Sequence, residues 1–431
     1  METTTNEVLK FVKENDVKFI RLGFCDLLGF QKNISIMAEE LPAAFENGIT
    51  FDGYAIKGFR DITQSDLFLF PDPATLTLLP WRPGPGRTAR FFCDIKNPDG
   101  TPFALDGRGI LKKVIAEYAK MGLVCTVGAE CEFYLFKTDE DGSPTFNPAD
   151  KGGYLDIAPL DKSEDIRREI CLVIEEMGIK PETSHHEQGP GQNEIDFKFS
   201  DALTCADNFL AFKTTVRKIA TRNGLFASFL PKPIADNPGS GLHVNLSLSD
   251  GGKNIFTNSI GEFTDDAKHF IAGILSKTPE ITLFLNPTAN SYDRFGKFEA
   301  PKYVSWSHQN RSQLIRIPAA KGEKVRMELR SPDPSLNPYL AFALILAAGL
   351  DGIKRKTPLP QAVDADLYDL KSNANIISTL KALPNNLQEA ITQAKNSSLI
   401  KHTLGNELLT KYTSMKESET DFTKEDYFET V

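Results

Sequence analysis

The sequence predicts a two-domain protein of mixed helices and strands, and three observations support this. The chain has 431 residues, which is more than one compact core usually holds. A turn-rich segment, NPDGTPFALDGRG at 97–109, interrupts the pattern and predicts a domain boundary there. Short strands dominate before this segment, and strands alternate with helices after it. We therefore expect one domain at 1–102 and a second at 103–431.

The expected N-terminal domain combines one helix with several short strands. Apolar periodicity predicts a helix at 6–15, followed by a strand, a turn and a second strand within VKFIRLGFCDLLGFQKNISI. Segment 67–95 contains strand-forming runs that Pro and Gly interrupt.

The expected second domain begins with a helix near 106–121 and carries most of the polar motifs. Residues 339–350 form its most apolar run, too short to span a bilayer, so we expect a buried helix capped by Asn337 with Pro338 at its first position. The other expected elements are strands at 124–136, 192–200, 226–230, 242–249, 313–317 and 324–331, and helices at 161–177, 206–223 and 264–277.

Charge and cysteine usage restrict the kind of protein. A net charge of -9 without a basic stripe disfavours nucleic acid or an acidic membrane as partner. The N-terminus, METTTNEVLKFVKEN, does not resemble a signal peptide. We expect a cytoplasmic protein with reduced core thiols, because no CxxC pair occurs among its six cysteines: Cys25, Cys93, Cys125, Cys131, Cys171 and Cys205.

Carboxylates and a histidine occupy one face of several expected strands. Because side chains alternate across a strand, GAECEFYLF at 128–136 puts Glu130 and Glu132 opposite its apolar residues. Burying such carboxylates without positive charge is costly, so this face predicts a bound cation. The matching polar positions are His243 and Asn245 in LHVNLSL, Arg326, Glu328 and Arg330 in VRMELR, and Glu194 and Asp196 in NEIDFKF.

The residue types favour divalent cations and a phosphate or carboxylate ligand. Several glutamates and one histidine suit Mg²⁺ or Mn²⁺, and their number suggests more than one metal. Arg311 and Arg316 in NRSQLIRIP add bidentate clamps. Metals together with arginines are typical of phosphoryl transfer. Neither GxxxxGK[ST] nor GxGxxG occurs, so those loops would not hold a nucleotide.

Each motif also has an ordinary structural explanation. An E-x-E pair is usually a solvated strand face, and a single histidine such as His243 is more often a satisfied polar residue. RMELR is compatible with a ladder of surface ion pairs, and GPGQNE with a simple turn. Their joint occurrence in one chain favours the functional interpretation.

Seven segments together resemble glutamine synthetases of the bacterial type I class, in the family's order, from about residue 18 to beyond 355. The short link between EFYLF and KGGY is similar to the shorter type I subclass. The resemblance implies an α+β fold, with a β-grasp-like N-terminal domain and a catalytic domain whose antiparallel strands form a funnel surrounded by helices. The segments are AECEF, KGGY, SHHEQGPGQNEIDF, GSGLHVNLSL, NPTANSYDRFGKFEAP, QNRSQLIRIP and MELRSPDPSLNPYLAFA.

The resemblance also implies a reaction and its ligands. ATP would phosphorylate the γ-carboxylate of glutamate, and ammonia would displace phosphate from the γ-glutamyl phosphate to give glutamine. Two or more Mg²⁺ or Mn²⁺ ions would serve each site. By resemblance, one metal would be held by Glu132, Glu187 and Glu194, and the other by Glu130, His243 and Glu328.

The remaining family positions carry over to substrate and nucleotide. Asp52, contributed by a neighbouring subunit, and Glu299 on a closing flap would take a proton from ammonium. This arrangement implies a homo-oligomer, either a hexameric ring or a dodecamer. Arg311 and Arg330 would be catalytic, while Arg294, Arg316, Gly239 and Tyr154 would bind substrate, and Phe199, Asn245, Ser247 and Arg326 would bind the nucleotide.

The sequence departs from the family near the amine. The family's FDGSSI reads FDGYAI, with Tyr54 and Ala55 replacing two serines beside Asp52. Retention of Asp52 and Glu299 favours ammonia. An alternative is a γ-glutamyl-amine ligase that uses an alkylamine or polyamine, and a second alternative is a glutamate or nucleotide sensor without turnover.

Other departures affect the flap, the C-terminal tail and a loop. Pro238 replaces the Asn of NGSGMH, Asp293 replaces a flap lysine, and the link from Arg294 to Glu299 is one residue shorter. The tail DFTKEDYFETV lacks the His-Pro-Trp that commonly precedes the residues joining two rings. Tyr368 in DLYDL resembles a tyrosine that some type I enzymes adenylylate. We interpret it as an ordinary exposed loop tyrosine and expect no modification.

Overall fold

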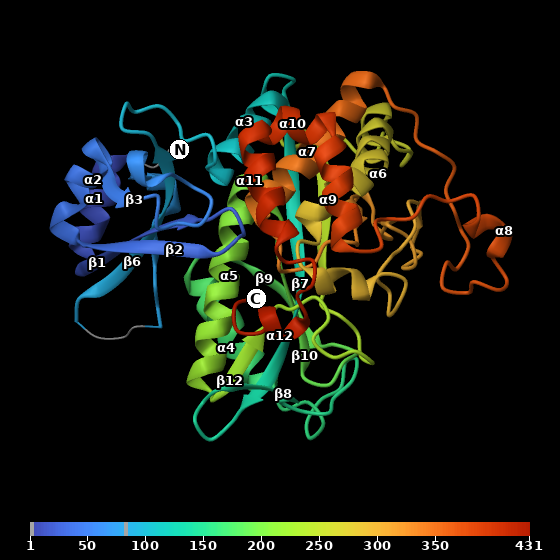
Figure 1. The fold of residues 1–431 in the computed structure, drawn as a ribbon, viewed down its shortest axis with the longest axis horizontal. Coiled ribbons are helices and arrows are strands. Elements are labelled where there is room, and N and C mark those ends of the chain that lie inside the picture. Colours follow the sequence, from blue (N-terminus) through green and yellow to red (C-terminus); the bar gives the residue numbers. More distant parts are fainter. Residues whose placement is uncertain (1–3, 82–84) are drawn as a thin grey trace.

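Two β-sheets organise the protein. The computed structural model describes residues 4–81 and 85–431, so residues 82–84 of the segment at 67–95 and the first three residues of the N-terminus lie outside the described residues. The smaller sheet lies on the left of Figure 1, and the larger sheet runs through the centre beneath a group of helices. Mixed helices and strands confirm the expected α+β class.

The smaller sheet contains six strands in the order β2-β1-β6-β4-β3, with β5 on β6. Strands β1 and β6 are parallel, and the other pairs are antiparallel. The helices of this region are α1 (Thr5–Glu14) and α2 (Leu41–Asn47). Its strands are β1 (Val17–Cys25), β2 (Gln31–Met37), β3 (Ile49–Asp52), β4 (Asp66–Pro71), β5 (Thr77–Leu78) and β6 (Arg87–Lys96).

The larger sheet contains eleven strands, and β7 (Leu123–Thr138) is its central member. Its main path is β15-β16-β17-β13-β7-β10-β9, while β8, β11 and β12 also pair with β7 and β14 pairs with β13. The other strands are β8 (Pro144–Pro148), β9 (Pro181–His186), β10 (Gln192–Phe197), β11 (Ser200–Asp201), β12 (Leu225–Ser228), β13 (Leu242–Asp250), β14 (Lys253–Asn254), β15 (Trp306–His308), β16 (Ile315–Ile317) and β17 (Met327–Leu329).

Helix α7 (Pro338–Arg355) lies at the centre of the helical layer and packs against α3, α5, α6 and α10. Asn337 caps it by accepting from the backbone of Tyr339, as the sequence predicts. No helix in the described ranges is both long and apolar enough to cross a membrane. The other helices are α3 (Gly107–Ala119), α4 (Glu164–Glu176), α5 (Ala202–Arg222), α6 (Asp265–Leu285), α8 (Ala374–Ile377), α9 (Leu387–Asn396), α10 (Ser398–Leu404), α11 (Asn406–Glu417) and α12 (Lys424–Tyr427).

One buried arginine connects the smaller sheet to helices that pack against the larger sheet. Arg108, in the first turn of α3, is 3% exposed. Its guanidinium donates to both carboxylate oxygens of Asp207 on α5, at 3.1 and 2.9 Å, and to Asp94 on β6 at 2.7 Å. A further contact of 3.0 Å reaches Asp72. A charged network therefore links β6 of the smaller sheet to α3 and α5, which pack against β7 of the larger sheet.

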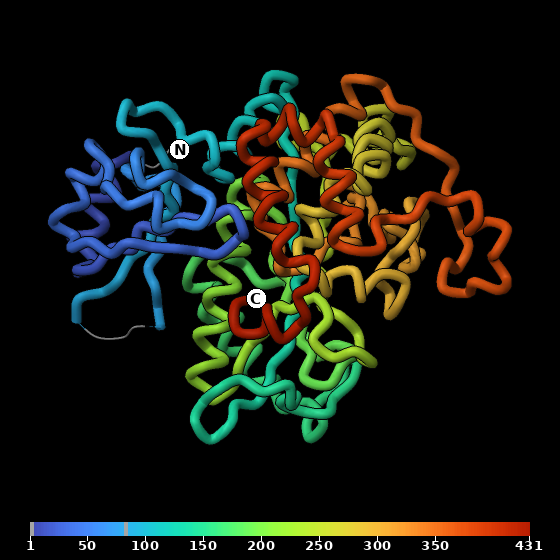
Figure 2. Tube along the Cα trace, in the orientation of Figure 1, coloured from blue at the N-terminus to red at the C-terminus, as the bar shows by residue number. Residues whose placement is uncertain are grey.

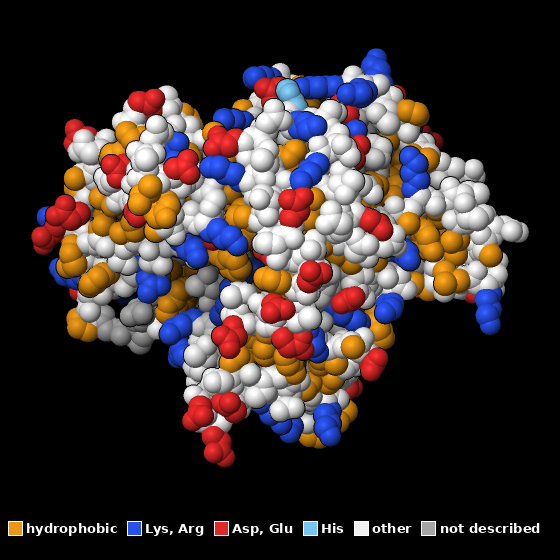
Figure 3. Space-filling view, viewed as in Figure 1, with side chains coloured by type: hydrophobic (Ala, Val, Ile, Leu, Met, Phe, Trp, Pro, Cys, Tyr) orange, Lys and Arg blue, Asp and Glu red, His pale blue; other side chains and the backbone are white. Residues whose placement is uncertain are grey.

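The C-terminal segment folds back over its own chain. Figure 2 shows it, in red, crossing the front of the larger unit and ending beside the green segments. Phe428 stacks on Phe146 of β8 with ring centroids 3.8 Å apart, and the carbonyl of Val431 accepts from the backbone of Phe229. On the face drawn in Figure 3, lysines and arginines are interspersed with acidic residues.

Several expected element boundaries were wrong. The expected strand at 192–200 is two strands, since β10 ends at Phe197, directly after a register irregularity, and β11 begins at Ser200. Helix α6 continues past the expected end at 277 through Pro279, where burial of its surroundings outweighs the helix-breaking effect of proline. The expected strands at 313–317 and 324–331 shorten to β16 and β17. The short elements α2, β3, β8, β9 and β15 were not expected, since brief runs give weak periodic signals.

Candidate active site

The polar faces of four strands meet in the larger sheet, as the alternation predicts. On β7, Glu130 pairs in register with His243 of β13 and with Asp196 of β10. Glu132 pairs with Glu194 of β10 in the same ladder. These three strands therefore bring their carboxylates and the histidine to one side of the sheet.

Strand β17 completes this group of side chains. Glu328 lies opposite Asn245 of β13. The Nδ1 atom of His243 is 3.5 Å from Glu130 Oε2 and 3.7 Å from Glu328 Oε1, and its Nε2 atom is 3.9 Å from Glu132 Oε1. All four side chains are largely buried. This arrangement surrounds one imidazole with three carboxylates.

A second group lies beside the first. Ligand atoms of His185, Glu187 and Glu194 fall within 4.8 Å of one another, and so do those of Glu130, Glu194 and His243. Glu194 belongs to both groups and therefore connects them. These distances are compatible with two neighbouring cation positions.

Three of the buried carboxylates have pKa values raised by burial. Burial raises the pKa of Glu132 to about 7, with Glu187 nearby, and that of Asp196 to about 6, with Glu130 nearby. Burial and the charges of Asp196 and Glu132 likewise raise the pKa of Glu194. Buried like charges are stable only when a cation compensates them. Carboxylate oxygens with one imidazole in each group therefore fit divalent metal ions.

Two carboxylates of the group already have partners that favour their ionised form. Burial opposes ionisation of Glu130, but His243, Asn245 and Arg326 lower its pKa to about 2. Burial also opposes ionisation of Glu328, while Arg330 and His243 lower its pKa. The site thus holds both charged and proton-retaining carboxylates.

Arginines line the same cavity. Glu328 accepts from Arg330 Nη1 at 2.5 Å and from Arg316 Nη1 at 2.6 Å. Arg294 is 3% exposed and donates to the carbonyl of Ser331 at 2.9 Å. The Nε atoms of Arg294, Arg316 and Arg330 are buried and have no partner among the described residues. Buried guanidinium groups with spare donors suit an anionic ligand.

The cavity between the carboxylates and arginines measures about 580 Å³. Gly239 and Tyr154 line it, as do Glu299, Arg311 and Phe298. A Cβ at Gly239 would lie 2.3 Å from the carbonyl oxygen of Pro231 and 2.6 Å from Arg294, so only glycine fits. Five of the six expected metal ligands therefore line one cavity with the arginines and the flap residues. The sixth, Glu328, does not line it but contacts His243.

Glu299 makes only long contacts in this cavity. Its Oε2 atom is 3.5 Å from Arg330 Nη2 and 3.7 Å from Arg311 Nη1, and its Oε1 accepts from Gln188 at 3.4 Å. Its carboxylate is consequently near the arginines without being fixed by a short ion pair.

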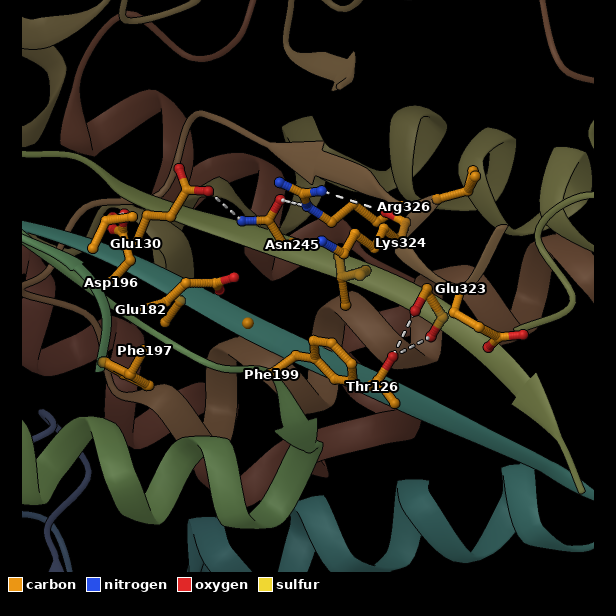
Figure 4. Close-up of a pocket in the computed structure, with 16 residues that line it drawn as sticks. Thr126, Glu130, Glu182, Asp196, Phe197, Phe199, Asn245, Glu323, Lys324 and Arg326 are labelled. Carbon is orange, nitrogen blue, oxygen red and sulfur yellow. Dashed lines mark hydrogen bonds between the residues drawn. The ribbon is translucent and has the colours of Figure 1, made fainter. Parts of the chain in front are cut away.

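A second cavity of about 300 Å³ adjoins the first, and both are lined by Glu130, Asp196 and Arg326. Asn245 donates to Glu130 at 2.9 Å and accepts from Arg326 at 2.7 Å. Figure 4 shows Asn245 between these two residues, with dashed lines to each. Phe199 is 64% exposed and, with Ser247, also lines this cavity. An exposed aromatic ring beside an arginine is a suitable surface for a planar base.

Asp52 does not reach this site within one chain. It lies exposed at the end of β3, in the smaller sheet, where its carboxylate accepts from the backbone of Tyr54 at 2.9 Å. It lines neither of the two adjoining cavities. A role for Asp52 at these cavities would require a second copy of the chain.

Sequence reasoning missed several polar residues of the site. Gln192 donates to Glu132 at 3.0 Å, and His185 lies beside Glu187 and Glu194. Gln188 contacts Glu299. All three missed residues belong to SHHEQGPGQNE, so the composition of that segment was the available signal.

The expectation of an exposed Tyr368 was wrong. Its phenolic oxygen is buried without a hydrogen-bond partner among the described residues. Burial raises its pKa, and Arg330 and Glu299 are among the charges around it. The loop before it is held in place because Ser312 accepts from the backbone of Leu367 at 3.1 Å, an interaction that sequence reading does not reveal.

Fold and site together define a class of protein. The α+β fold carries buried carboxylates that fit divalent cations, a neighbouring arginine cluster and an adjoining cavity with an aromatic side chain. These features are typical of enzymes that catalyse metal-assisted phosphoryl transfer.

Comparison with known proteins identifies the family within that class. The glutamine synthetase catalytic domain matches residues 104–430, and the glutamine synthetase beta-Grasp domain matches 16–98. Glutamine synthetase of Methanosarcina mazei is 48% identical over 97% of this chain and 94% of its own. That of Clostridium saccharobutylicum is 47% identical over 97% of this chain and 95% of its own. The chain belongs to the glutamine synthetase family.

Solved structures agree with this assignment. A GmaS/ADP complex superposes with a TM-score of 0.87 at 31% identity, covering 97% of this chain and 98% of that protein. Glutamine synthetase of Plasmodium falciparum superposes with a TM-score of 0.85 at 25% identity, covering 99% of each chain. These matches confirm the resemblance and the fold that the sequence motifs implied.

Proposed function

We propose that this chain is an ATP-dependent glutamate-ammonia ligase, which forms glutamine, ADP and phosphate through γ-glutamyl phosphate. The observation that carries the proposal is the continuity of two cavities: carboxylates and arginines line one, and Phe199 and Arg326 line the other. Glutamate would occupy the first and ATP the second. The γ-phosphoryl group would then lie where Glu130, Asp196 and Arg326 border both cavities.

We propose that the six residues implied by the family resemblance bind two metal ions, either Mg²⁺ or Mn²⁺. Bound metals would neutralise the charge that develops on the transferring phosphoryl group. The pKa values raised by burial in Glu132 and Glu194 support this assignment, since compensation by a cation would stabilise both carboxylates. The six residues are Glu130, Glu132, Glu187, Glu194, His243 and Glu328.

The arginines would orient glutamate and stabilise anionic groups. We propose that Arg294 and Arg316 bind the substrate, with Gly239 and Tyr154 lining its pocket. Arg311 and Arg330 would stabilise the phosphoryl group as it transfers. Arg316 and Arg330 pair with Glu328, and the buried Nε atoms of Arg294, Arg316 and Arg330 are spare donors, which supports these roles. Arg311 is half exposed and lies 3.7 Å from Glu299.

The amine step would use two carboxylates. Glu299 would accept a proton from ammonium, together with Asp52 from a neighbouring copy, so the free amine can attack the acyl phosphate. Closure of the loop that carries Glu299 would exclude water and limit hydrolysis. We also propose that Phe199 and Arg326 contact the nucleobase of ATP, and that Asn245 and Ser247 line the wall of its cavity.

The same proposal covers organisation and location. A shared site implies a homo-oligomer, a ring of six or two such rings, because Asp52 is remote from the cavities of its own chain. We place the domain boundary between 102 and 103. The cysteines are free thiols, which supports a cytoplasmic location.

The test is phosphate release from ATP with glutamate and Mg²⁺, supplying ammonium, methylamine, ethanolamine or putrescine in parallel. We expect ammonium to give the highest turnover per concentration and glutamine to accumulate in step with phosphate. Faster turnover with an alkylamine would overturn the choice of ammonia. ATP binding without phosphate release for any amine would indicate a sensor.

A matched pair of variants ties the activity to the site. Glu299→Gln should lower turnover strongly while leaving ATP binding near wild type, because the residue acts in the amine step. Glu176→Gln, exposed on α4 and outside both cavities, should have little effect on turnover. Equal losses in both variants would argue against the assigned role of Glu299.

A further inference from the structure

The loop that carries Glu299 has an unusual backbone. Phe298 and Glu299 have φ angles of 47° and 65°, in the left-handed region that residues with side chains rarely adopt. Two consecutive residues of this kind persist only where surrounding contacts hold them. The Phe298 side chain is 47% exposed, so its own burial is incomplete. Backbone hydrogen bonds from Gly296 to Ala300 at 2.8 Å and from Ala300 to Lys297 at 3.0 Å close the turn itself. A separate contact must hold the tip of this turn against the cavity wall.

Lys232 supplies a contact at that point. The residue is 4% exposed, and its Nζ atom lies 4.5 Å from the centroid of the Phe298 ring. The same ammonium donates to the carbonyl of Asn237. The backbone carbonyl of Lys232 in turn accepts from Asn290 at 3.2 Å. One buried cation thus contacts both the flap and the loop at 237–239.

The loop at 237–239 is part of the cavity wall. The carbonyl of Pro238 accepts from the hydroxyl of Tyr134 at 2.6 Å. The carbonyl of Gly239 accepts from Gln192 at 3.1 Å, and the same amide nitrogen of Gln192 donates to Glu132 at 3.0 Å. Lys232 therefore connects the flap to a wall that is itself bonded to the carboxylate group.

We propose that Lys232 is a positioning residue that holds the flap closed. Its ammonium keeps Phe298 against the wall at 237–239, and so keeps Glu299 over Arg330 and Arg311. The long contacts of Glu299 leave its position to the backbone of the loop. This inference rests on the proposed function, since the value of a held flap lies in shielding γ-glutamyl phosphate from water.

The charge of Lys232 is available at neutral pH. Burial lowers its pKa to about 8, with Lys297 and Arg294 adding to the effect and Asp293 and Asp236 opposing it. Assays at pH 7 therefore test the charged form. A desolvated cation over an aromatic ring is also the case in which the attraction is strongest.

The first measurement reports the flap without reference to activity. Lys297 is exposed and directly precedes Phe298, so trypsin can cut between them when the loop opens. In Lys232→Met, which keeps the apolar stem and removes the charge, we expect release of the fragment beginning at Phe298 to be about three- to tenfold faster. Lys232→Arg should restore slow cleavage, since a guanidinium also attracts the ring.

A matched control separates the flap contact from general loss of a cation–ring pair. Lys96 lies 4.0 Å from the ring centroid of Phe70 in the smaller sheet. Lys96→Met should leave cleavage after Lys297 at the wild-type rate. Cleavage as slow in Lys232→Met as in wild type, or equally fast in Lys96→Met, would overturn the proposal.

The second measurement reports the consequence for chemistry. Phosphate released per glutamine formed should be close to one in wild type and should rise about threefold or more in Lys232→Met. An unchanged ratio together with faster cleavage would reject the shielding role. A wild-type protein that forms no glutamine would reject the proposed function, while the trypsin comparison would still decide whether Lys232 holds the loop.

Phe298→Leu covers the case in which Lys232→Met does not fold. This variant keeps an apolar side chain and leaves the lysine in place, and its folding can be verified by circular dichroism. We expect faster cleavage after Lys297, because the ring that the ammonium attracts is gone. Wild-type cleavage in this variant would contradict the proposal.

Discussion

Glu132 lowers the stability of the metal-free protein and offers a carboxylate for cation binding. Its side chain is buried and accepts from Gln192 and from the backbone of Gly241 at 2.9 Å. These bonds do not offset its burial beside Glu187, and its pKa rises to about 7. A carboxylate in this position is retained at a cost to the metal-free protein, which a bound cation would offset.

The first prediction concerns this trade. Glu132→Gln keeps the shape and removes the charge, so the metal-free protein at pH 8 should gain on the order of 1 kcal/mol of unfolding free energy. The rise in melting temperature that Mn²⁺ produces should shrink or vanish. Differential scanning fluorimetry with EDTA-treated protein, with and without Mn²⁺, measures both.

A surface carboxylate provides the comparison. Glu169 pairs with Arg222 at 3.4 Å, and Glu169→Gln should change neither the metal-free stability nor the response to Mn²⁺ appreciably. A destabilised Glu132→Gln protein that responds to Mn²⁺ like wild type would contradict the assignment of Glu132 as a ligand.

At the scale of single elements, α5 contacts the segment that follows β17. Lys213 on this helix donates to the carbonyl of Pro334 at 2.6 Å and lies near the rings of Phe209 and Phe229. It thereby holds the segment that follows β17 and Arg330. Burial lowers the pKa of Lys213 to about 7, with Arg217 adding to the effect.

The second prediction follows from that pKa. Between pH 7 and the ordinary lysine pKa of 10.5, the unfolded chain binds a proton that the folded chain does not. The contribution of Lys213 to stability should therefore increase with pH in this window. Relative to Lys213→Met, wild type should gain on the order of 1–2 kcal/mol from pH 7 to pH 9.

Thermal unfolding at the two pH values measures this difference. Lys218, exposed on the same helix, supplies the control variant Lys218→Met, whose difference from wild type should stay constant. If Lys213→Met shows a constant difference as well, the lysine is not buried in the way the structure describes.

At the scale of the whole molecule, Arg108 links the smaller sheet to the helices of the larger unit. It contacts Asp207 on α5, Asp94 on β6 and Asp72. Removing one member of a buried charge network leaves the others unpaired. We predict that Arg108→Met lowers the unfolding free energy by about 3 kcal/mol.

Chemical denaturation measures this loss. The double variant Arg108→Met/Asp207→Asn should recover part of it, because the unpaired charge of Asp207 is also removed. Additive losses in the double variant would show that the two residues do not interact.

The fourth prediction tests assembly. Asp52→Asn and Glu299→Gln should each be nearly inactive as separate proteins. If the site is shared between copies, coexpression should restore up to about a quarter of wild-type activity, because some interfaces combine two intact partners. Size-exclusion chromatography confirms that the two variants mix, and mixed oligomers without recovered activity would contradict a shared site.

Local sequence rules predicted much of the fold and the residue types that gather on the polar face of the larger sheet. Alternation along β7 and β13 was enough to put Glu130, Glu132 and His243 on one polar face, because the side-chain period of a strand depends only on its backbone. The cap of α7 at Asn337 was likewise a local signal. The family motifs then supplied the roles expected of each residue.

Tertiary structure alone decided which of these residues meet. The register that joins β7 to β13 and β10 depends on long-range strand pairing and packing. The burial of the Tyr368 hydroxyl and the contact between Lys232 and Phe298 also depend on segments far apart in the chain. Helix α6 passes through Pro279 for the same reason: surrounding burial outweighs a local preference. By itself the sequence determined residue types and their faces, because these depend on local backbone geometry. Distances, burial and pKa values came from contacts between segments far apart in the chain.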